Sequence, residues 1–185
     1  MLKRFVLITF FFIPQLFLAQ SAKNHSALDR LGLAEGYYGY KLYYPGDNGE
    51  LSLVNEVLPS TGKAEDKLLI QRILNKNYFR MTVNGGGLIY ELNLGFDQFR
   101  DKYVVVAFEN APGLLDVYQG SRNTDKTLQM DNLESGTHFL DANGTKVHNR
   151  LTFKNMTQNS FTLEVEATID FGKSWFSQAR YEFMK

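Results

Sequence analysis

The last 25 residues of the chain alternate between apolar and polar side chains, and this pattern strongly constrains the fold. In residues 161–169 the odd-numbered positions are Phe, Leu, Val, Ala and Ile, whereas the even-numbered positions are Thr and Glu. After residues 170–172, the odd-numbered positions of residues 175–183 are Trp, Ser, Ala, Tyr and Phe. A period of two places successive side chains on opposite faces of a β-strand. The segment therefore predicts a β-hairpin whose odd-numbered residues lie on a dry face.

The same β pattern continues through the chain from residue 36 onward. Its short runs are separated by Gly- and Asn-containing turn sequences, among them residues 45–49, 84–87 and 143–144. Short turns favour an up-and-down meander over a Greek key, and closing the meander into a barrel removes two exposed edges. We predict an all-β fold, namely an antiparallel up-and-down β-barrel of about ten strands, with a two-sheet sandwich as the alternative.

The first 20 residues differ in character from the rest of the chain. Lys3 and Arg4 precede an apolar run from Phe5 to Leu18, and small residues follow from Ala19. This order is typical of a secretory signal peptide, and the apolar run is shorter than the roughly 20 residues of a membrane-spanning helix. We therefore expect export to the bacterial periplasm or the cell exterior, with no stable membrane anchor after cleavage.

The expected domain organisation is a signal peptide at residues 1–20 and a polar spacer with a short helical turn at residues 21–35. Leu28, Leu31 and Leu33 are spaced to face inward from that turn. Residues 36–185 are then expected to form one lipocalin-like β-barrel domain, because a mature chain of this length is an ordinary size for one domain.

Charge and cysteine content exclude several classes of function. Without Lys3 and Arg4, the 20 basic residues fall to 18 against 20 acidic ones, a net charge of −2. A near-neutral chain with scattered basic residues lacks the electrostatic signature of a nucleic-acid-binding protein. The chain has no Cys, so disulfides and thiolate chemistry are excluded.

Few residues suggest catalysis or metal binding. Glu164 and Glu166 lie on one face of a predicted strand, about 6.6 Å apart by the strand rise, a spacing that suits a glycoside hydrolase. A solvated outer face gives the same pattern, and we prefer that interpretation. His138 and His148, with Asp141, offer a possible metal site, but two solvated loop histidines are the simpler interpretation. We expect no metal, no cofactor and no enzymatic activity.

The aromatic residues are more informative: of the 15 Phe and ten Tyr, all but the five Phe of residues 1–20 lie in the predicted β region. Aromatic side chains that fill the core are the simplest interpretation, since they dominate core burial. A wider barrel would instead use some of them to line a cavity for a small hydrophobic ligand, with Arg80, Arg150 or Arg180 holding an acidic head group. The predicted lining residues are Phe79, Tyr90, Tyr118, Arg150, Phe161, Trp175, Tyr181 and Phe183.

Two groups of segments carry a resemblance to a known family. The segments are residues 90–97, 103–109, 117–120, 150–153, 169–175 and 180–183. With the Gly36–Gly39 opening, they resemble an uncharacterised, lipocalin-like bacterial family of domains of unknown function. That family tends to show an Asp-Gly-Gly-Lys-Thr-Trp turn before its last strand, whereas Phe171 here stands in place of a turn Gly. Likewise, Gly95-Phe96 stands in place of a Gly-Tyr pair. The resemblance implies a calycin-type barrel and no established activity.

Three hypotheses for function follow from these observations. The first is an exported protein that binds a small hydrophobic ligand in its barrel. The second is an envelope protein–protein interaction module, motivated by the aromatic strand Tyr37–Tyr44. The third is a hydrolase that uses Glu164 and Glu166, and it requires both carboxylates to point into a pocket.

Overall fold

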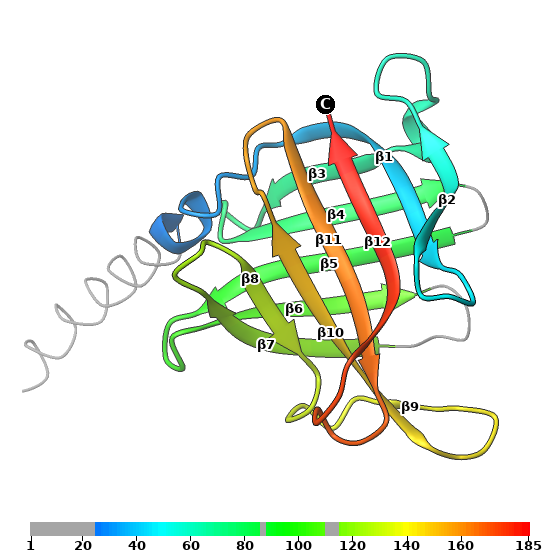
Figure 1. The fold of residues 1–185 in the computed structure, drawn as a ribbon. Helices are drawn as coiled ribbons and strands as arrows, with labels where there is room; N and C mark the ends of the chain where they lie inside the picture. Colours follow the sequence, from blue (N-terminus) through cyan, green and yellow to red (C-terminus); the bar gives the residue numbers. More distant parts are fainter. Residues whose placement is uncertain (1–24, 86–87, 110–114) are drawn as a thin grey trace, which may run out of the picture.

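The computed structural model describes residues 25–85, 88–109 and 115–185 (Figure 1). The expected signal peptide at residues 1–20 and the centre of the turn at residues 84–87 lie outside the described residues. Within them the structure has twelve strands and one 3₁₀ turn, η1 (Ala64–Asp66). The strands are β1 (Gly36–Pro45), β2 (Leu51–Val57), β3 (Leu68–Ile73), β4 (Tyr78–Gly85), β5 (Leu88–Asp97), β6 (Lys102–Glu109), β7 (Leu115–Arg122), β8 (Leu128–Asp131), β9 (Phe139–Leu140), β10 (Lys146–Lys154), β11 (Ser160–Thr168) and β12 (Phe176–Met184).

Ten of the strands close into an antiparallel barrel, which confirms the predicted fold class. Around the barrel the order is β1, β3, β4, β5, β6, β7, β8, β10, β11 and β12, so neighbours in the wall follow the chain. The barrel closes where β12 pairs with β1, with Phe183 opposite Tyr40. β2 and β9 stand outside this order: β2 pairs with β1, and β9 pairs with β10 (Figure 1).

The predicted alternation explains the two faces of the β10–β11 wall. Leu151 pairs with Val165 and Phe153 pairs with Leu163, and these side chains pack in the core. The intervening residues of both strands are mostly charged or polar, as expected for the opposite face of a pleated sheet. On β11 the odd-numbered residues 161, 163 and 167 are buried, as predicted. Ile169 lies past the strand end and is 58% exposed, so its predicted place on the dry face is wrong.

A β-bulge on β12 changes which residues face the barrel interior. Val165 pairs with Ala179 and Glu166 pairs with Ser177, so Gln178 has no partner on β11. A bulge adds one residue to a strand and reverses the alternation on one side of it. Positions before Gln178 therefore have the opposite parity from those after it, and the predicted inward position of Trp175 is wrong.

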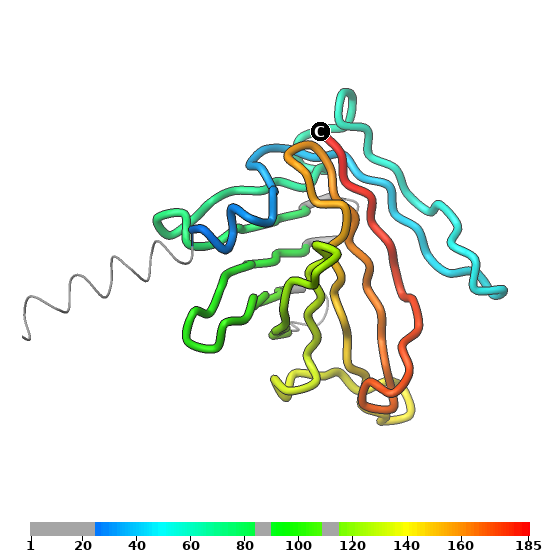
Figure 2. The backbone as a smooth tube through the Cα atoms, turned by 60° about the vertical axis from the view of Figure 1, so that its left-hand side comes forward, coloured from blue at the N-terminus to red at the C-terminus, as the bar shows by residue number. Residues whose placement is uncertain are grey.

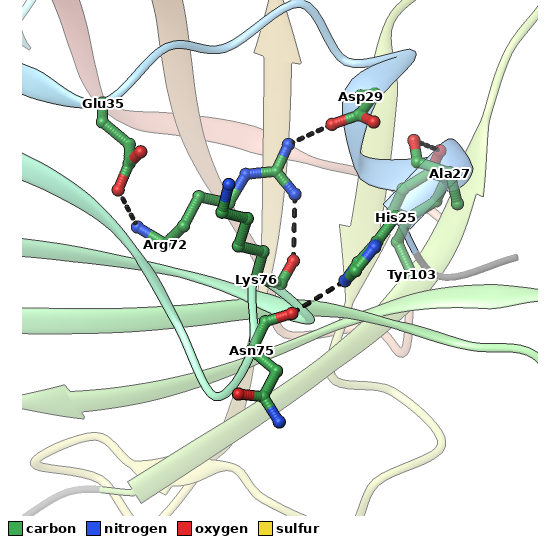
Figure 3. Close-up of polar contacts among 8 residues, drawn as sticks. All are labelled: His25, Ala27, Asp29, Glu35, Arg72, Asn75, Lys76 and Tyr103. Atoms are coloured by element: carbon green, nitrogen blue, oxygen red, sulfur yellow. Dashed lines mark hydrogen bonds and ion pairs between the residues drawn. The ribbon is translucent and has the colours of Figure 1, made fainter. Parts of the chain in front are cut away.

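The N-terminal helix (residues 25–29) covers one end of the barrel, where β6 begins. Leu28, Leu31 and Leu33 are buried in the core, as their spacing predicted. The hydroxyl of Tyr103 donates a hydrogen bond of 2.8 Å to the carbonyl of Ala27 (Figure 3). Apolar contact and a buried hydrogen bond together anchor this end of the chain to the barrel.

Arg72 on β3 joins the N-terminal helix to the β3–β4 turn. Its guanidinium donates to Asp29 at 2.5 Å and to the carbonyl of Lys76 at 3.1 Å, and its backbone N–H donates to Glu35 at 2.7 Å (Figure 3). The guanidinium also lies 3.9 Å from the ring centroid of Phe79, within the range of a cation–π interaction. A planar guanidinium suits these simultaneous contacts.

The β1–β2 hairpin extends beyond the barrel wall (Figure 2). Residues 36–38 of β1 pair with β3, which continues the barrel wall. Residues 40–45 of β1 pair with β2, which lies beside the wall. Residues 51–56 of β2 are all exposed, including Leu51, Leu53 and Val54. Among the described strands, β2 therefore has an exposed edge despite the closure of the barrel, and the sequence pattern did not predict it.

Candidate functional site

A pocket opens at the barrel end opposite the N-terminal helix. β6 begins next to that helix, whereas β7, which runs antiparallel to β6, begins at the other end. The pocket has a volume of about 220 Å³. We call it the mouth pocket, and it is lined by Tyr90, Asp116, Tyr118, Phe139, Asn149, Leu151, Val165 and Gln178.

The polar side of the mouth pocket is a small hydrogen-bonded cluster. The Tyr118 hydroxyl donates to Asp116 Oδ2 at 2.9 Å, and Asn132 Nδ2 donates to Asp116 Oδ1 at 3.3 Å. Asn132 is fully buried, and its Oδ1 accepts a hydrogen bond of 2.8 Å from the backbone N–H of Asn149. The side-chain Oδ1 of Asn149 is buried without a hydrogen-bond partner. The cluster thus fixes the orientation of Asp116 and leaves one acceptor unused.

Burial extends the pH range over which Tyr118 stays protonated. Desolvation is the main cause that raises the pKa of this phenol far above its ordinary value, and the nearby Tyr90 and Asp116 raise it further. The phenol therefore stays protonated near neutral pH and acts as the donor to Asp116. A neutral donor beside a carboxylate leaves the negative charge of Asp116 without a compensating positive charge.

Apolar side chains form the rest of the pocket wall. Leu151 is buried in the core, and Val165 packs against the same core from β11. Phe139 on the short strand β9 lines the pocket from outside the barrel order. Gln178 is the bulge residue of β12, and the bulge is the reason that this even-numbered side chain reaches the interior. The pocket combines an apolar wall with a few placed polar groups, as ligand sites generally do.

The barrel interior beyond the mouth pocket is almost filled. An apolar cavity of about 20 Å³ lies among Leu68, Met81, Val83, Tyr90, Leu92, Phe161, Leu163, Tyr181 and Phe183. That volume is close to the minimum of about 10–15 Å³ that one water molecule needs. Aromatic side chains pack around this small cavity, such as Phe161 and Phe183, whose ring centroids are 4.5 Å apart, in line with the simpler interpretation that they fill the core. The mouth pocket offers more room for an organic ligand than this cavity does.

The predicted lining residues fall into four groups. Tyr90 and Tyr118 line the mouth pocket, and Tyr90 also borders the inner cavity. Phe161, Tyr181 and Phe183 border that inner cavity. Phe79 is fully buried and fills the core beneath Arg72. The remaining two, Arg150 and Trp175, do not line the interior.

Arg150 and Trp175 instead meet on the outer face of the wall. Arg150 pairs with Glu166, one position away from the inward pair of Leu151 and Val165, and its Nε donates to Glu166 at 2.8 Å. Its guanidinium lies 4.3 Å from the Trp175 ring centroid. The prediction that both residues line a cavity is wrong. Alternation along β10 places Arg150 on the outer face, and the bulge on β12 places Trp175 there as well.

The other candidate arginines are also held by carboxylates of the outer face. Arg80 contacts Glu91 at 3.4 Å, and Arg180 contacts Glu182 at 2.9 Å. Both arginines alternate with core residues, Met81 on β4 and Ala179 on β12. The interior therefore does not use these arginines to hold an acidic head group.

Glu164 and Glu166 lie on the outer face, where each contacts a basic residue of β10. Glu164 forms an ion pair with Lys154, and Glu166 forms one with Arg150. Glu164 pairs with Thr152 of β10 and lies between Leu163 and Val165, which face inward. Alternation along β11 therefore turns Glu164 outward. The hydrolase hypothesis required both carboxylates to point into a pocket, and this arrangement removes that support.

His138 and His148 meet, as their flanking positions suggested, with ring centroids 5.3 Å apart. His148 lies on β10 rather than in a loop and is only 4% exposed, so its expected solvation is wrong. The ring of Phe171 packs edge-on against it, and the Nδ1 of His148 is buried without a hydrogen-bond partner. Across the described residues, no group of three His, Cys, Asp or Glu side chains is arranged to hold a metal ion.

The chain matches no protein-family model and no curated protein. The lipocalin-like resemblance therefore stays a prediction, while the closed barrel itself is observed. No helix within the described ranges has the length and apolar character needed to cross a membrane.

Sequence reasoning missed most of the mouth pocket. Asp116 and Tyr118 are two residues apart on one strand, so their shared face was a usable signal for a carboxylate beside a phenol. Phe139 lies on β9 and Asn149 lies on β10, and these two strands pair with each other. The convergence of the two residues on the pocket therefore depends on tertiary structure. Gln178 was not predictable from alternation, because its inward position results from a bulge.

Larger hollows lie on the outside of the barrel. One of about 540 Å³ includes Gly95, Val104 and Val106, which alternate along β5 and β6 with the core residues Leu94 and Val105. It is therefore a groove over the outer wall. The mouth pocket differs from it because inward-facing residues of strands on several sides of the barrel, Tyr118 and Leu151 among them, converge on it.

Proposed function

We propose that the protein binds a small organic molecule in the mouth pocket. The observation that carries this proposal is a hollow of about 220 Å³ at the barrel end opposite the N-terminal helix, whereas the inner cavity among the described core residues is only about 20 Å³. The apolar side of the ligand contacts Leu151, Val165 and Phe139, and its polar side contacts the Asp116 cluster. The volume is below the roughly 300–1,000 Å³ of pockets for drug-sized ligands, so the ligand is correspondingly small.

The rigidity of the surrounding wall supports this function. Leu151 and Tyr118 are buried and belong to the core, so the pocket is held by packed strands rather than by side chains that must order on binding. Preformed sites avoid much of the entropy loss that weakens association. The placement of polar groups on one side also gives the site a means of orienting its ligand.

Pocket filling provides the direct test. Val165→Phe adds volume inside the mouth pocket, whereas Val106→Phe adds the same volume in the groove on the outer wall. We expect ligand-observed NMR with a library of small aromatic fragments to detect binding to the wild type and to Val106→Phe. Binding should be lost in Val165→Phe. If fragments bind all three proteins equally, the mouth pocket is not the site.

We further propose that the protein functions after export to the periplasm or the cell exterior. The basic start followed by a short apolar run supports export. Intact mass measurement of protein recovered from the periplasm or medium of a bacterial host should show the loss of about 20 residues. Retention of Met1–Ala19 on the recovered protein would contradict export by signal cleavage.

The exposed edge of β2 supports a second candidate function, a protein–protein interaction module. Among the described strands β2 pairs only with β1, and exposed strand edges readily pair with another chain. A second copy of this chain is the partner that fits. In an antiparallel pair centred on Val54, Leu51 lies opposite Val57 and Ser52 lies opposite Glu56, so no like charges face each other.

Self-association through β2 predicts a concentration-dependent dimer. Val54→Lys would place two like charges opposite each other at the centre of that pair and should keep the protein monomeric. Leu115→Lys is the control, because Leu115 is an exposed apolar residue on β7. Light scattering coupled to size exclusion measures the mass of each protein. A wild type that stays monomeric at high concentration, or a dimer that Val54→Lys leaves intact, would contradict this candidate.

A further inference from the structure

We propose that the ligand of the mouth pocket carries a protonated amine that binds Asp116. This inference rests on the proposed function and narrows its ligand class to small amines with one apolar group. Among the described residues that line the pocket, Asp116 is the only Asp, Glu, Lys, Arg or His. The formal charge of the lining is therefore −1, and a cation is the complementary ligand.

The charge of Asp116 is not neutralised within the described part of the chain. Its oxygens accept hydrogen bonds from two neutral donors, the Tyr118 hydroxyl and the Asn132 amide. The ion pairs of the described residues do not include Asp116, and the nearby strand cation, Arg150, is held on the outer face by Glu166. A partly buried carboxylate without a counter-charge favours a positively charged partner.

Free acceptors on this side of the pocket also favour an ammonium group. A carboxylate has about four lone-pair sites, and the two neutral donors use two of those on Asp116. The Oδ1 of Asn149 is a further acceptor, buried and without a partner. An ammonium group brings three N–H donors and no acceptor, whereas a carboxylate ligand brings acceptors only. The carboxylate and the unused amide oxygen therefore favour an amine, and the negative charge of Asp116 disfavours an acid.

The apolar wall sets the rest of the ligand. Phe139, Leu151 and Val165 contribute ring and aliphatic surface to the same pocket. A compound with one aromatic ring and a short aminoalkyl chain would place its ring against these side chains and its ammonium near Asp116. This charge preference is the reverse of the arginine-bound acidic head group expected from the sequence.

The test compares three ligands of similar size and shape: 2-phenylethylamine, 2-phenylethanol and 3-phenylpropionate. Their dissociation constants are measured at pH 7 and low ionic strength by calorimetry and by protein-observed NMR of Tyr118 and Leu151. We expect the amine to bind at least tenfold more tightly than the alcohol and the acid to bind more weakly than both. Raising the salt concentration should weaken the amine selectively, because screening acts on the charge pair.

Asp116→Asn tests the role of the charge with little change in shape. We expect it to weaken the amine at least tenfold more than the alcohol, which removes the preference for the amine. Asp47→Asn, in the exposed β1–β2 turn, is the matched control and should retain the preference. If Asp116→Asn fails to fold by circular dichroism, Asn149→Leu replaces it, and it should weaken the amine severalfold more than the alcohol.

The outcomes separate the ligand class from the proposed function. If the alcohol or the acid binds the mouth pocket as tightly as the amine, the amine class is wrong but small-molecule binding stands. If all three ligands leave the Tyr118 and Leu151 resonances unchanged at millimolar concentration, the amine inference is overturned. Fragment binding that Val165→Phe abolishes would then still support the proposed function, and its absence would overturn that as well.

Discussion

Tyr118 and Asp116 point to the same face of β7, and their side-chain oxygens are joined by a hydrogen bond of 2.9 Å. Two residues on one strand thus form a donor–acceptor pair inside the barrel mouth. Because Asn132 holds the other carboxylate oxygen, Asp116 is oriented before any ligand arrives. In the proposed ligand site, this orientation in advance would reduce the entropy lost when a ligand binds.

Replacing Tyr118 with Phe should destabilise the protein in a pH-dependent manner. Loss of a buried hydrogen bond to a carboxylate costs about 2 kcal/mol at neutral pH. The raised pKa of Tyr118 favours the protonated phenol in the folded state, so its contribution is complete below the unfolded pKa of about 10 and declines as the pH rises above it. Urea unfolding at pH 8 and pH 11 should show the difference between wild type and variant shrinking. A constant difference would contradict a raised pKa.

Asp170→Asn should weaken the β11–β12 turn more at neutral pH than at low pH. The hydroxyl and backbone N–H of Ser174, followed by the Thr168 hydroxyl, hold the pKa of Asp170 well below its ordinary range. A lowered pKa contributes stability above the unfolded value of about 3.9, and this contribution is lost as the pH falls below it. Thermal unfolding at pH 7 and pH 3 should give a larger loss for the variant at pH 7. Asp47→Asn is the control and should show little change at either pH.

Gly120→Ala should destabilise the barrel by about 3 kcal/mol through overpacking. A Cβ at this position would lie 1.9 Å from the backbone carbonyl oxygen of Gln129 and 2.7 Å from the Cα of Met130. Backbone atoms of the paired strand β8 cannot move without disturbing its hydrogen bonds to β7. Gly46→Ala is the control, since its nearest neighbour would be 3.5 Å away. Equal urea midpoints for the two variants would show that β7 and β8 are less closely packed than described.

Arg72→Ala should release the N-terminal helix from the barrel end without unfolding the barrel. The variant loses the contacts to Asp29, the Lys76 carbonyl and the Phe79 ring, which together contribute about 2 kcal/mol. Hydrogen exchange should become faster in residues 27–33 while β10 and β11 retain their protection. Arg100→Ala removes an exposed ion pair with Asp97 and is the control. Unchanged exchange in residues 27–33 would show that apolar burial and the Tyr103 hydrogen bond anchor the helix without Arg72.

The hairpin of β11 and β12 illustrates how far alternation predicts a fold. Phe161 and Leu163 face the core as predicted, because burial of one face fixes the register of a strand. Trp175 does not, because the unpaired Gln178 shifts the parity of everything before it. A bulge of one residue has no clear signal in the sequence. The alternation pattern therefore assigned Trp175, which precedes the bulge, to the wrong face.

The residues that line the mouth pocket were likewise predicted only in part from the sequence. Tyr90 and Tyr118 were among the predicted lining residues and do line it. Asp116 was not among the predicted lining residues, although its distance of two residues from Tyr118 placed both on one face. Asn149 and Phe139 were not predicted at all, because β9 and β10 bring them to the pocket through pairing between segments.

The sequence by itself determined the all-β class, the antiparallel meander with short turns, and the burial of Leu28, Leu31 and Leu33. These features follow from local periodicity and turn residues, which act over a few positions of the chain. The tertiary structure decided whether the barrel is hollow, which face Arg150 and Trp175 occupy, and where β2 lies. Those outcomes depend on the packing of side chains from distant strands and on one bulge, and no local pattern encodes how closely such side chains fill a shared interior.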